Sequence, residues 1–440
     1  EQSIITKMLI KLVTKYKSFT VNSLFILILV VLVNGRSLLG LYIFGFRLAE
    51  LLTGLSIFLL FLLIYKNNYF RENLSSRFIF SYLLLVLYFF IFNFINSANF
   101  LDLYIYKSSV YIWYISFMFF GFIVFKNIEI SKNFFYFGYL GLLIQFMFNV
   151  IYYPDFLTRF FNEYSDKTQF LKGAEIAIFF IVVTFFANKF ANNGPLIDLF
   201  VLTSSIYVPL IFFKSRSAAI ALFAYIFVMI LRKKNYFFEN LKKSLILLLI
   251  SIVLFLTTSH FLVDNTFEVQ ETPDAVAQVF KHKYIVSNTY DDEVPLFYIY
   301  EGRIFSADGN LNWRLQLWQD IYMFAEQNNE IIFGQGFHTK PLVFNNFIYS
   351  GVDGLNENSH NYFLNIFIRS GIFGLFMIAF FFYNMFKLRK VGFNNFELLT
   401  FTLPIFFISM FDGSMENPYF AIVFYFFVSS FYSGVIFKNR

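Results

Sequence analysis

The chain has 440 residues, of which 58% are hydrophobic and only 14% are charged. A soluble domain would carry about 25% charged residues, so the composition excludes an ordinary soluble protein. The chain has no cysteine, which excludes disulfides, thiol catalysis and cysteine-ligated zinc. Its formal net charge of +6 comes from basic residues spread over many loops, so we expect no binding of nucleic acid.

Apolar segments of roughly 17 to 25 residues recur along the chain, and each is long enough to cross about 30 Å of hydrocarbon. A membrane barrel would instead show segments of roughly 10 residues in which apolar and polar side chains alternate. We therefore predict an all-α polytopic membrane protein with about 12 transmembrane helices. The predicted spans are 19–33, 48–65, 78–96, 110–125, 134–152, 173–188, 197–213, 217–231, 244–262, 361–385, 397–411 and 419–437.

Residues 1–18 precede the first span, and we expect no cleavable signal peptide there. Within them, residues 4–15 have the pattern of an amphipathic helix, with apolar side chains on one side and lysines on the other. Because lysines favour an anionic lipid surface, we expect this helix to lie on the cytoplasmic leaflet.

The Lys and Arg residues of the short loops predict the orientation of the chain in the membrane. With the N-terminus inside, the inner segments hold 20 of these residues and the short outer loops hold 8. We therefore predict that both termini lie in the cytoplasm. Residues 19–262 then form spans one to nine, 360–440 form spans ten to twelve, and a large loop, 263–359, lies outside between spans nine and ten.

This outer loop has 97 residues, of which 14 are acidic and 5 are basic. We expect it to be partly helical, because residues 312–327 place Trp313, Leu317, Ile321 and Phe324 on one stripe of a helix. Loops of this length inside compact proteins are usually functional, and a transporter seldom needs one.

Arg216 opens the eighth predicted span, and Ser215 before it is a good helix N-cap. An arginine beside the free N–H groups of a helix N-terminus makes a strong site for phosphate. The alternative is an arginine that only anchors the helix end at the membrane surface.

Arg314 lies between two tryptophans in NWRLQLW, where a guanidinium could bind a pyrophosphate through two hydrogen bonds. The spacing alone favours an arginine on the wet face of an amphipathic helix. Arg303, in EGRIF, is a rival for the same role.

The outer loop re-enters the membrane at Glu357, His360 and Asn361, which with Arg314 form the dense set of reactive side chains in the sequence. A histidine at an outer helix end titrates near neutral pH, which suits a general base. The alternative is an interfacial histidine that is hydrogen-bonded to a loop.

Deeper in the same span, we expect Gly371 and Gly374 to let a neighbouring helix approach closely. Arg369 falls on the helix face opposite His360. Because a charge within a span is costly, we expect Arg369 to form a structural ion pair.

No motif for a metal or a nucleotide cofactor is present: the chain has no P-loop, GxSxG, HExxH or Rossmann glycine pattern. Asp291, Asp292 and Glu293 could bind a hard cation, although a solvated turn is the preferred interpretation. We therefore predict no cofactor and no metal.

Three segments together resemble the O-antigen ligase and O-antigen polymerase superfamily of bacterial membrane glycosyltransferases. SRSAAIAL resembles its Ser-Arg-small motif at a helix start, and NWRLQLWQDIYMFAEQNNEIIFGQGF resembles its Arg-x-x-x-Trp helix followed by a Gly-x-Gly-aromatic loop. SHNYFLNIFIRSGIFGL resembles its His-Asn-aromatic-Leu re-entry helix. The segments cover roughly residues 200 to 385, in the order that the family has.

This resemblance implies an inverting, metal-independent transfer of a glycan from an undecaprenyl-pyrophosphate carrier to an acceptor sugar, at the outer face of the bacterial inner membrane. It implies that Arg216 and Arg314 hold the pyrophosphate and that His360 orients or deprotonates the acceptor. Ser215, Arg303, Glu357 and Asn361 are then candidates for substrate binding.

The motifs leave open whether the acceptor is a second carrier-linked repeat unit, as in a polymerase, or lipid A core, as in a ligase. We favour a polymerase, for which a chain-length regulator is a candidate partner. A related O-oligosaccharyltransferase or a Gram-positive capsule polymerase would look similar. Two further classes are a transporter of lipid-linked glycan, which would need repeats and several charges within the membrane, and a non-catalytic assembly scaffold.

Overall fold

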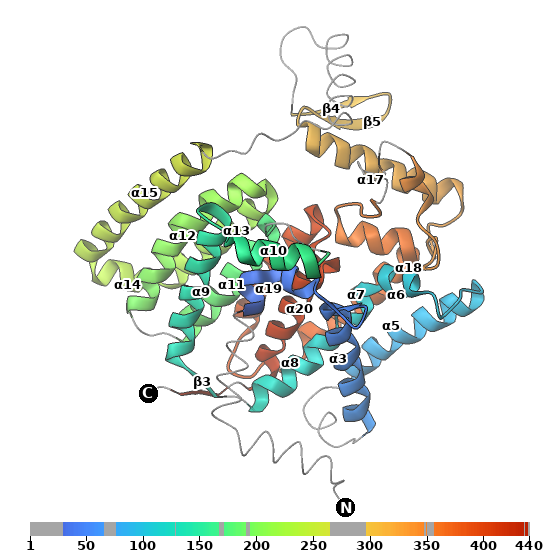
Figure 1. Cartoon of the computed structure of the whole chain (residues 1–440), viewed down its shortest axis with the longest axis horizontal. Helices are drawn as coiled ribbons and strands as arrows, with labels where there is room; N and C mark the ends of the chain where they lie inside the picture. Colours follow the sequence, from blue (N-terminus) through green and yellow to red (C-terminus); the bar gives the residue numbers. More distant parts are fainter. Residues whose placement is uncertain are drawn as a thin grey trace, which may run out of the picture.

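The computed structural model describes residues 30–65, 76–127, 129–166, 171–190, 194–264, 296–346, 349, 356–434 and 436–438. The predicted helix 4–15, most of the first predicted span and the acidic cluster Asp291–Glu293 lie outside these residues. Figure 1 shows a bundle of helices with helix α17 and a β-hairpin above one end.

The bundle helices follow the apolar segments of the sequence. They are α3 (Leu48–Tyr65), α5 (Ser76–Ile95), α7 (Val110–Trp113), α8 (Ser116–Asn127), α9 (Lys132–Val150), α11 (Gly173–Phe190), α12 (Gly194–Lys214), α13 (Arg216–Arg232), α15 (Leu241–Asp264), α18 (Tyr362–Lys387), α19 (Asn395–Phe411), α20 (Pro418–Val428) and α21 (Ser430–Ser433). Each predicted span from 48–65 onward overlaps one of these helices, or two short ones at 110–125 and 419–437.

Shorter helices lie between them. They are α6 (Leu103–Ser108), α10 (Asp155–Tyr164), α14 (Lys234–Glu239) and the two 3-10 turns η1 (Leu342–Asn345) and η2 (Ser414–Glu416).

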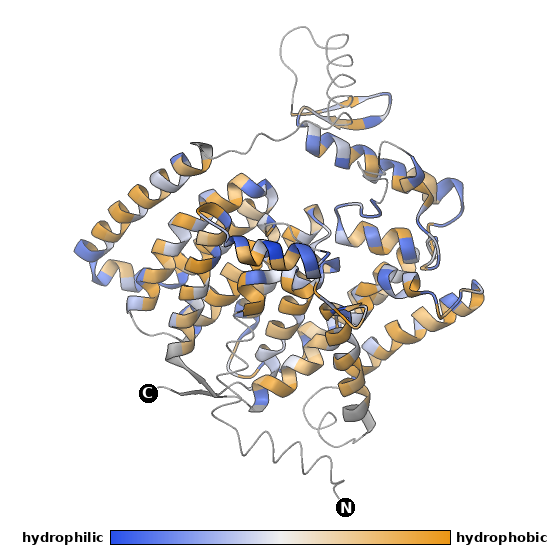
Figure 2. Ribbon diagram, in the orientation of Figure 1, coloured by the Kyte–Doolittle hydropathy of each residue, from blue (hydrophilic) through white to orange (hydrophobic). Residues whose placement is uncertain are grey.

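Four of the described helices are long and apolar enough to cross a membrane, namely Arg77–Ile95, Gly194–Lys214, Leu241–Leu262 and Tyr362–Lys387. A fifth span results if Phe134–Val150 and Asp155–Tyr164, which meet at an angle of 84°, count as one broken span. Figure 2 shows how apolar residues dominate the bundle. The structure therefore confirms an all-α membrane protein, and the number of 12 spans stays a prediction.

The centre of the bundle is formed by helices that are apolar on every side. Residues 173–188 of α11 and residues 419–428 of α20 are all buried. Phenylalanine rings fill the space between them. For example, the ring centroids of Phe186 in α11 and Phe427 in α20 are 5.7 Å apart. By contrast, only 22% of the apolar 18-residue stretch within Leu241–Leu262 of α15 is buried, and this helix packs mainly on α12. An all-apolar helix that is not covered by protein is suited to contact with lipid.

Above the bundle, α17 (Gly309–Gln327) confirms the helix predicted at 312–327. Leu317 and Ile321 are buried in a second apolar cluster, against which Trp313 packs. The hairpin of β4 (Phe297–Tyr300) and β5 (Arg303–Ser306) pairs in antiparallel fashion and lies against α17.

Elsewhere in the described residues, short strands pair in two places. Strands β1 (Tyr42–Ile43) and β2 (Phe46–Arg47) form an antiparallel hairpin, whereas β3 (Glu129–Ser131) and β6 (Ile436–Lys438) pair in parallel.

Helix α18 is broken at Gly371, where φ is 61° and ψ is −161°. Residues 331–336 run through the break and replace the missing helical hydrogen bonds. The N–H groups of residues 372 and 373 donate to the carbonyls of 331 and 332 at 2.9 and 3.0 Å, and those of 335 and 336 donate to the carbonyls of 368 and 369 at 2.8 and 3.0 Å. All four backbone pairs are thus satisfied, as the membrane interior requires.

This break corrects the expectation that Gly371 and Gly374 admit a neighbouring helix. The backbone that approaches Gly371 belongs to the loop, because a Cβ at this position would lie 2.2 Å from the carbonyl oxygen of Ile332. At Gly374 a Cβ would meet Ser370 of the same helix at 2.1 Å. The spacing of the glycines resembles a helix-packing motif, but here it permits a left-handed backbone and the close passage of a loop.

Candidate active site

A cavity of about 1260 Å³ opens between α3, α5, α6, the segment before α18, and η2. One part of its wall is apolar and comes from α3 and α5, with Leu51, Leu55 and Phe90 among the lining residues. The other part is rich in charge. Its charged residues are Arg36, Arg47, Lys107, Lys172 and Arg369 with Glu50, Glu175, Glu357, Asp412 and Glu416. A cavity of this kind can hold a ligand that has a lipid part and an anionic, hydroxyl-rich part.

His360 lines this cavity in a left-handed backbone conformation, with φ at 55°. Its backbone N–H donates to Asn358 Oδ1 at 2.6 Å, and its ring meets the ring of Trp313 edge-on at 5.4 Å. Burial, together with the positive charges of Arg314 and Lys172, lowers the pKa of His360 to about 4. The imidazole is therefore neutral at pH 7 and free to accept a proton.

Arg314 lies next to this histidine but outside the cavity wall. Its Nη1 donates to the carbonyl of Phe411 at 2.5 Å, and its buried Nε has no hydrogen-bond partner among the described residues. Asp412, which lines the cavity, is close enough for its negative charge to offset part of the lowering that burial causes in the pKa of both Arg314 and His360. The structure thus brings His360, Arg314 and Asp412 together.

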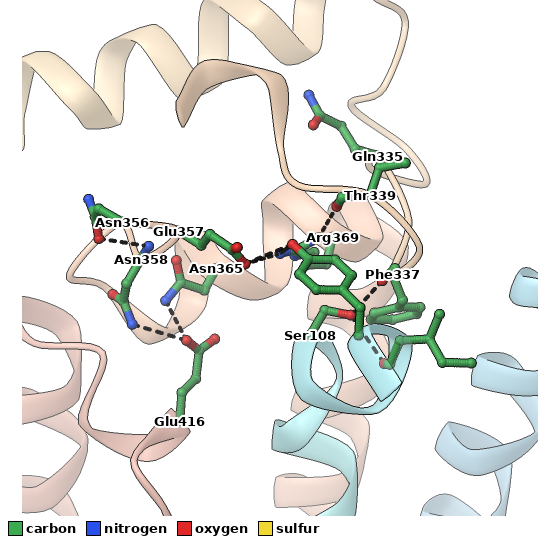
Figure 3. A network of polar contacts seen from close by, with 12 residues as sticks. Ser108, Gln335, Phe337, Thr339, Asn356, Glu357, Asn358, Asn365, Arg369 and Glu416 are labelled. Atoms are coloured by element: carbon green, nitrogen blue, oxygen red, sulfur yellow. Dashed lines mark hydrogen bonds and ion pairs between the residues drawn. The ribbon is translucent and has the colours of Figure 1, made fainter. Parts of the chain in front are cut away.

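Arg369 lies at the break in α18 and faces the cavity. Its Nη2 donates to the hydroxyl of Tyr104 at 2.8 Å, its Nη1 donates to the carbonyl of Thr339, and it pairs with Glu357 at 3.6 Å (Figure 3). The Tyr104 hydroxyl in turn donates to Glu357 at 2.7 Å, and burial raises the pKa of this tyrosine to about 12. The predicted ion pair of Arg369 is present, and it forms part of the cavity wall.

The expectation that Arg369 lies opposite His360 is wrong, since both line one cavity. The helical spacing that suggested opposite faces does not apply, because α18 begins at Tyr362 and His360 precedes it with a non-helical backbone.

Glu416 is the centre of a second polar network (Figure 3). Its Oε2 accepts hydrogen bonds from the side-chain amides of Asn358 at 3.1 Å and Asn365 at 2.9 Å. Burial raises the pKa of Glu416 to about 8, so the carboxyl is mostly protonated at pH 7. The accessible part of this side chain faces the cavity.

Several predicted site residues have other roles in this conformation. Arg216 is 75% exposed and pairs with Asp308 at 2.5 Å, and Arg303 pairs with Asp320 at 2.6 Å. Ser215 and Asn361 are the N-caps of α13 and α18. None of these four residues lines the cavity as the described residues define it, whereas His360 and Glu357 do.

Glu416 and Asp412 could not be recognised as site residues from the sequence, and the cavity-lining residues Arg36, Arg47, Lys107 and Lys172 looked only like loop charges. The signal available was weak: short loops between apolar spans that still carry charge, such as FDGSMENP.

Among the described residues, no group of three or more His, Asp or Glu could hold a metal ion. Residues 199–379 match the family model described as O-antigen ligase. No curated protein matches the chain. The match runs from α12 to α18 and includes α17, His360 and the broken helix, and it confirms the resemblance to the O-antigen ligase and polymerase superfamily.

Proposed function

We propose that this protein, with an O-antigen ligase domain at residues 199–379, is a polymerase that joins undecaprenyl-pyrophosphate-linked repeat units at the outer face of the inner membrane. The observation that carries this proposal is the cavity: a neutral histidine from the matched domain faces a space lined partly by charged side chains of both signs and partly by apolar side chains. The lipid carrier, its pyrophosphate and the sugar each find a suitable surface there.

The apolar wall of α3 and α5 suits the first isoprene units of the carrier. The pyrophosphate needs positive charge, and Arg369 of α18 and Lys107 supply it from the cavity wall. In the same wall, Tyr106, Trp113 and Tyr114 offer the aromatic faces and edges against which sugar rings pack. Glu357 and Asn358 can accept hydrogen bonds from, or donate them to, sugar hydroxyls.

In the reaction, a hydroxyl of the acceptor sugar attacks the anomeric carbon of the donor. The new bond joins the acceptor oxygen to this carbon, and the bond from the carbon to the phosphate oxygen breaks. The electron pair leaves on the pyrophosphate, and His360 takes the proton of the hydroxyl. Attack opposite the leaving group inverts the anomeric centre.

Positive charge near the leaving pyrophosphate stabilises the transition state. Arg314 is the better supported of the two arginines proposed from the resemblance, because it lies beside His360. Arg216 and Arg303 would first have to leave Asp308 and Asp320. Bound pyrophosphate would also raise the pKa of His360 and so make it a stronger base during the reaction.

A ligase that transfers carrier-linked glycan to lipid A core is the alternative, since the same cavity and the same chemistry serve both acceptors. The polymerase and the ligase hypotheses both have the termini in the cytoplasm and α17 outside. Broken helices also occur in transporters, where the break can bind an ion. In α18, the backbone of residues 331–336 fills the break, so the described residues leave no open ion site there.

The test is complementation of a deletion strain with wild type, His360→Ala or Arg314→Ala, with the surface glycan resolved by length. We expect His360→Ala to lower transfer by about 10²- to 10⁴-fold at normal protein abundance, because a general base is lost. A ladder reduced to one repeat unit on core identifies a polymerase.

Loss of all core-linked glycan with long carrier-linked chains identifies the ligase instead. Asn384→Ala is the matched control: Asn384 is a buried polar residue of α18 whose amide, within the described part of the chain, donates to its own helix through the carbonyl of residue 380. An unchanged ladder in both active-site variants would contradict the proposal.

A further inference from the structure

We infer that Glu416 is a positioning residue for His360, and that it acts through the side-chain amides of Asn358 and Asn365. The inference rests on the proposed function for the role of His360. It adds a residue outside the matched domain to the reaction, since Glu416 lies in η2, between α19 and α20.

Each asparagine amide has one end that donates and one end that accepts hydrogen bonds. Both donating ends face Glu416 Oε2, at 3.1 and 2.9 Å. The accepting ends are thereby aimed at the segment before α18. Asn358 Oδ1 receives the N–H of His360 at 2.6 Å, and Asn365 Oδ1 receives the N–H and the hydroxyl of Ser359 at 2.8 and 2.6 Å.

The backbone that these bonds hold is one that histidine rarely adopts, with φ at 55°. A left-handed residue outside glycine persists only where its surroundings fix it. Ser359 is fully buried, and Trp318 donates to its carbonyl at 2.8 Å from the other side. The Glu416 network and α17 therefore hold the segment from two sides, and His360 points into the cavity as a result.

The backbone before Glu416 also permits the close contact between η2 and Asn358. A Cβ at Gly413 would lie 2.4 Å from Asn358 Nδ2, so a glycine is needed for η2 to come this close. Asn417, the residue after Glu416, donates a hydrogen bond to Glu175 of α11 and is the N-cap of α20. These contacts fix η2 in the bundle, so Glu416 can act as a rigid acceptor for both amides.

Charged and titratable groups lie close to Glu416 on two of the elements that pack on η2. Arg369 lies on α18, Tyr111 on α7, and Tyr362 opens α18. Asp412 follows α19. Because burial keeps the carboxyl protonated at pH 7, a neutral glutamine can replace it: its carbonyl oxygen can accept both amide hydrogens.

The experiment compares full-length wild type, Glu416→Leu, Glu416→Gln, Asn358→Ala and the Glu416→Leu/Asn358→Ala double variant, with Asn384→Ala as control. Transfer from a synthetic polyprenyl-pyrophosphate glycan is measured in liposomes. We expect Glu416→Leu and Asn358→Ala each to lower kcat by about 10²-fold through misplacement of the base, with little change in KM.

The double variant should be no slower than either single variant, because both changes break one pathway. Glu416→Gln should stay within about threefold of wild type, as the conservative rescue requires. Wild-type kcat in Glu416→Leu and Asn358→Ala, additive losses in the double variant, or a Gln variant as slow as the Leu variant would each overturn the inference. If Glu416→Leu fails to fold, Asn358→Ala alone decides.

A second readout does not depend on transfer. Histidine-selective NMR, with His360→Gln to assign the signal, gives the pKa of His360 in each variant. We expect Glu416→Leu or Asn358→Ala to raise this pKa toward its ordinary value as the ring leaves its buried position, and Glu416→Gln to leave it low. An unchanged pKa in the Leu and Ala variants overturns the inference even if the wild type proves inactive, an outcome that would contradict only the proposed function.

Discussion

Glu397 and Glu416 are two carboxyl groups enclosed by the bundle, near its opposite ends. Their hydrogen-bond partners are entirely different. Glu397, at the start of α19, is 3% exposed and is bonded by Lys189 at 2.8 and 3.0 Å and by Arg232 at 2.5 Å. It also accepts the N–H of Asn394 in a capping box. Glu416 has two neutral amides as partners and a cavity beside it; among the described residues, no cation lies within ion-pair distance of it.

Helix α13 shows how far apart the two ends are. Arg216 at its start contacts α17, and Arg232 at its end contacts Glu397. At 1.5 Å per residue, its 17 residues span about 25 Å. At one end, the closed end, the charges of Glu397, Lys189 and Arg232 pair with one another. At the other end, the open end, polar groups surround the cavity. The closed end stabilises the fold, and the open end holds the cavity of the proposed active site.

The largest effect on stability should come from the closed end. Glu397→Leu leaves Lys189 and Arg232 without their shared partner, which costs about 3–5 kcal/mol when a buried pair loses one member. We expect a strong fall in protein abundance and in thermal stability. The molecules that do fold should transfer glycan at the wild-type rate. A normal melting temperature with lost transfer would reverse the roles of the two ends.

A smaller effect is expected at the break in α18. Gly371→Ala places a Cβ against the carbonyl of Ile332 and forces a left-handed alanine, a change of the overpacking kind that typically costs about 1–3 kcal/mol. Because Arg369 lies at this break, transfer should fall as well. Gly392→Ala is the control, since its φ is also positive, at 76°, but a Cβ there meets nothing within 4 Å. Equal losses in both variants would show that backbone strain alone is responsible.

A further expected effect is a pH dependence of stability. The folded pKa of Glu416, about 8, lies above its ordinary value of 4.5, so its contribution is fully present below pH 4.5 and is lost as pH rises through 8. For His360 the folded pKa of about 4 lies below 6.5, so stability is lost as pH falls through this window. Glu416→Gln should flatten the alkaline side of a melting-temperature profile, and His360→Gln the acid side. An alkaline side that is unchanged in Glu416→Gln would show that this carboxyl is already ionised.

The helices could be predicted from the sequence because a long apolar run has few other ways to satisfy its backbone in lipid. Helix α17 was predictable from the stripe of Leu317 and Ile321. The number of membrane crossings is harder to read from hydropathy, because a central helix such as α11 is apolar for packing as much as for lipid contact.

The site was only partly predictable. His360 and Arg314 stood out because they lie in the segment that resembles a known family. Glu416 did not, since a single carboxylate in a short loop looks like a solvated charge until Asn358 and Asn365 are seen beside it. The break at Gly371 was missed for a similar reason: its hydrogen bonds go to residues about 40 positions earlier, and no local pattern reports them.

The loop that fills the break in α18 also has a consequence for how the protein is made. Alone in hydrocarbon, the broken helix would leave backbone N–H and C=O groups unpaired, which is costly. Residues 331–336 leave the ribosome before α18 does, and they must already lie at the membrane when that helix enters. Placement of residues 331–336 is therefore a step in the insertion of the helix itself, and a delay in that placement would leave α18 without a stable place in the bilayer.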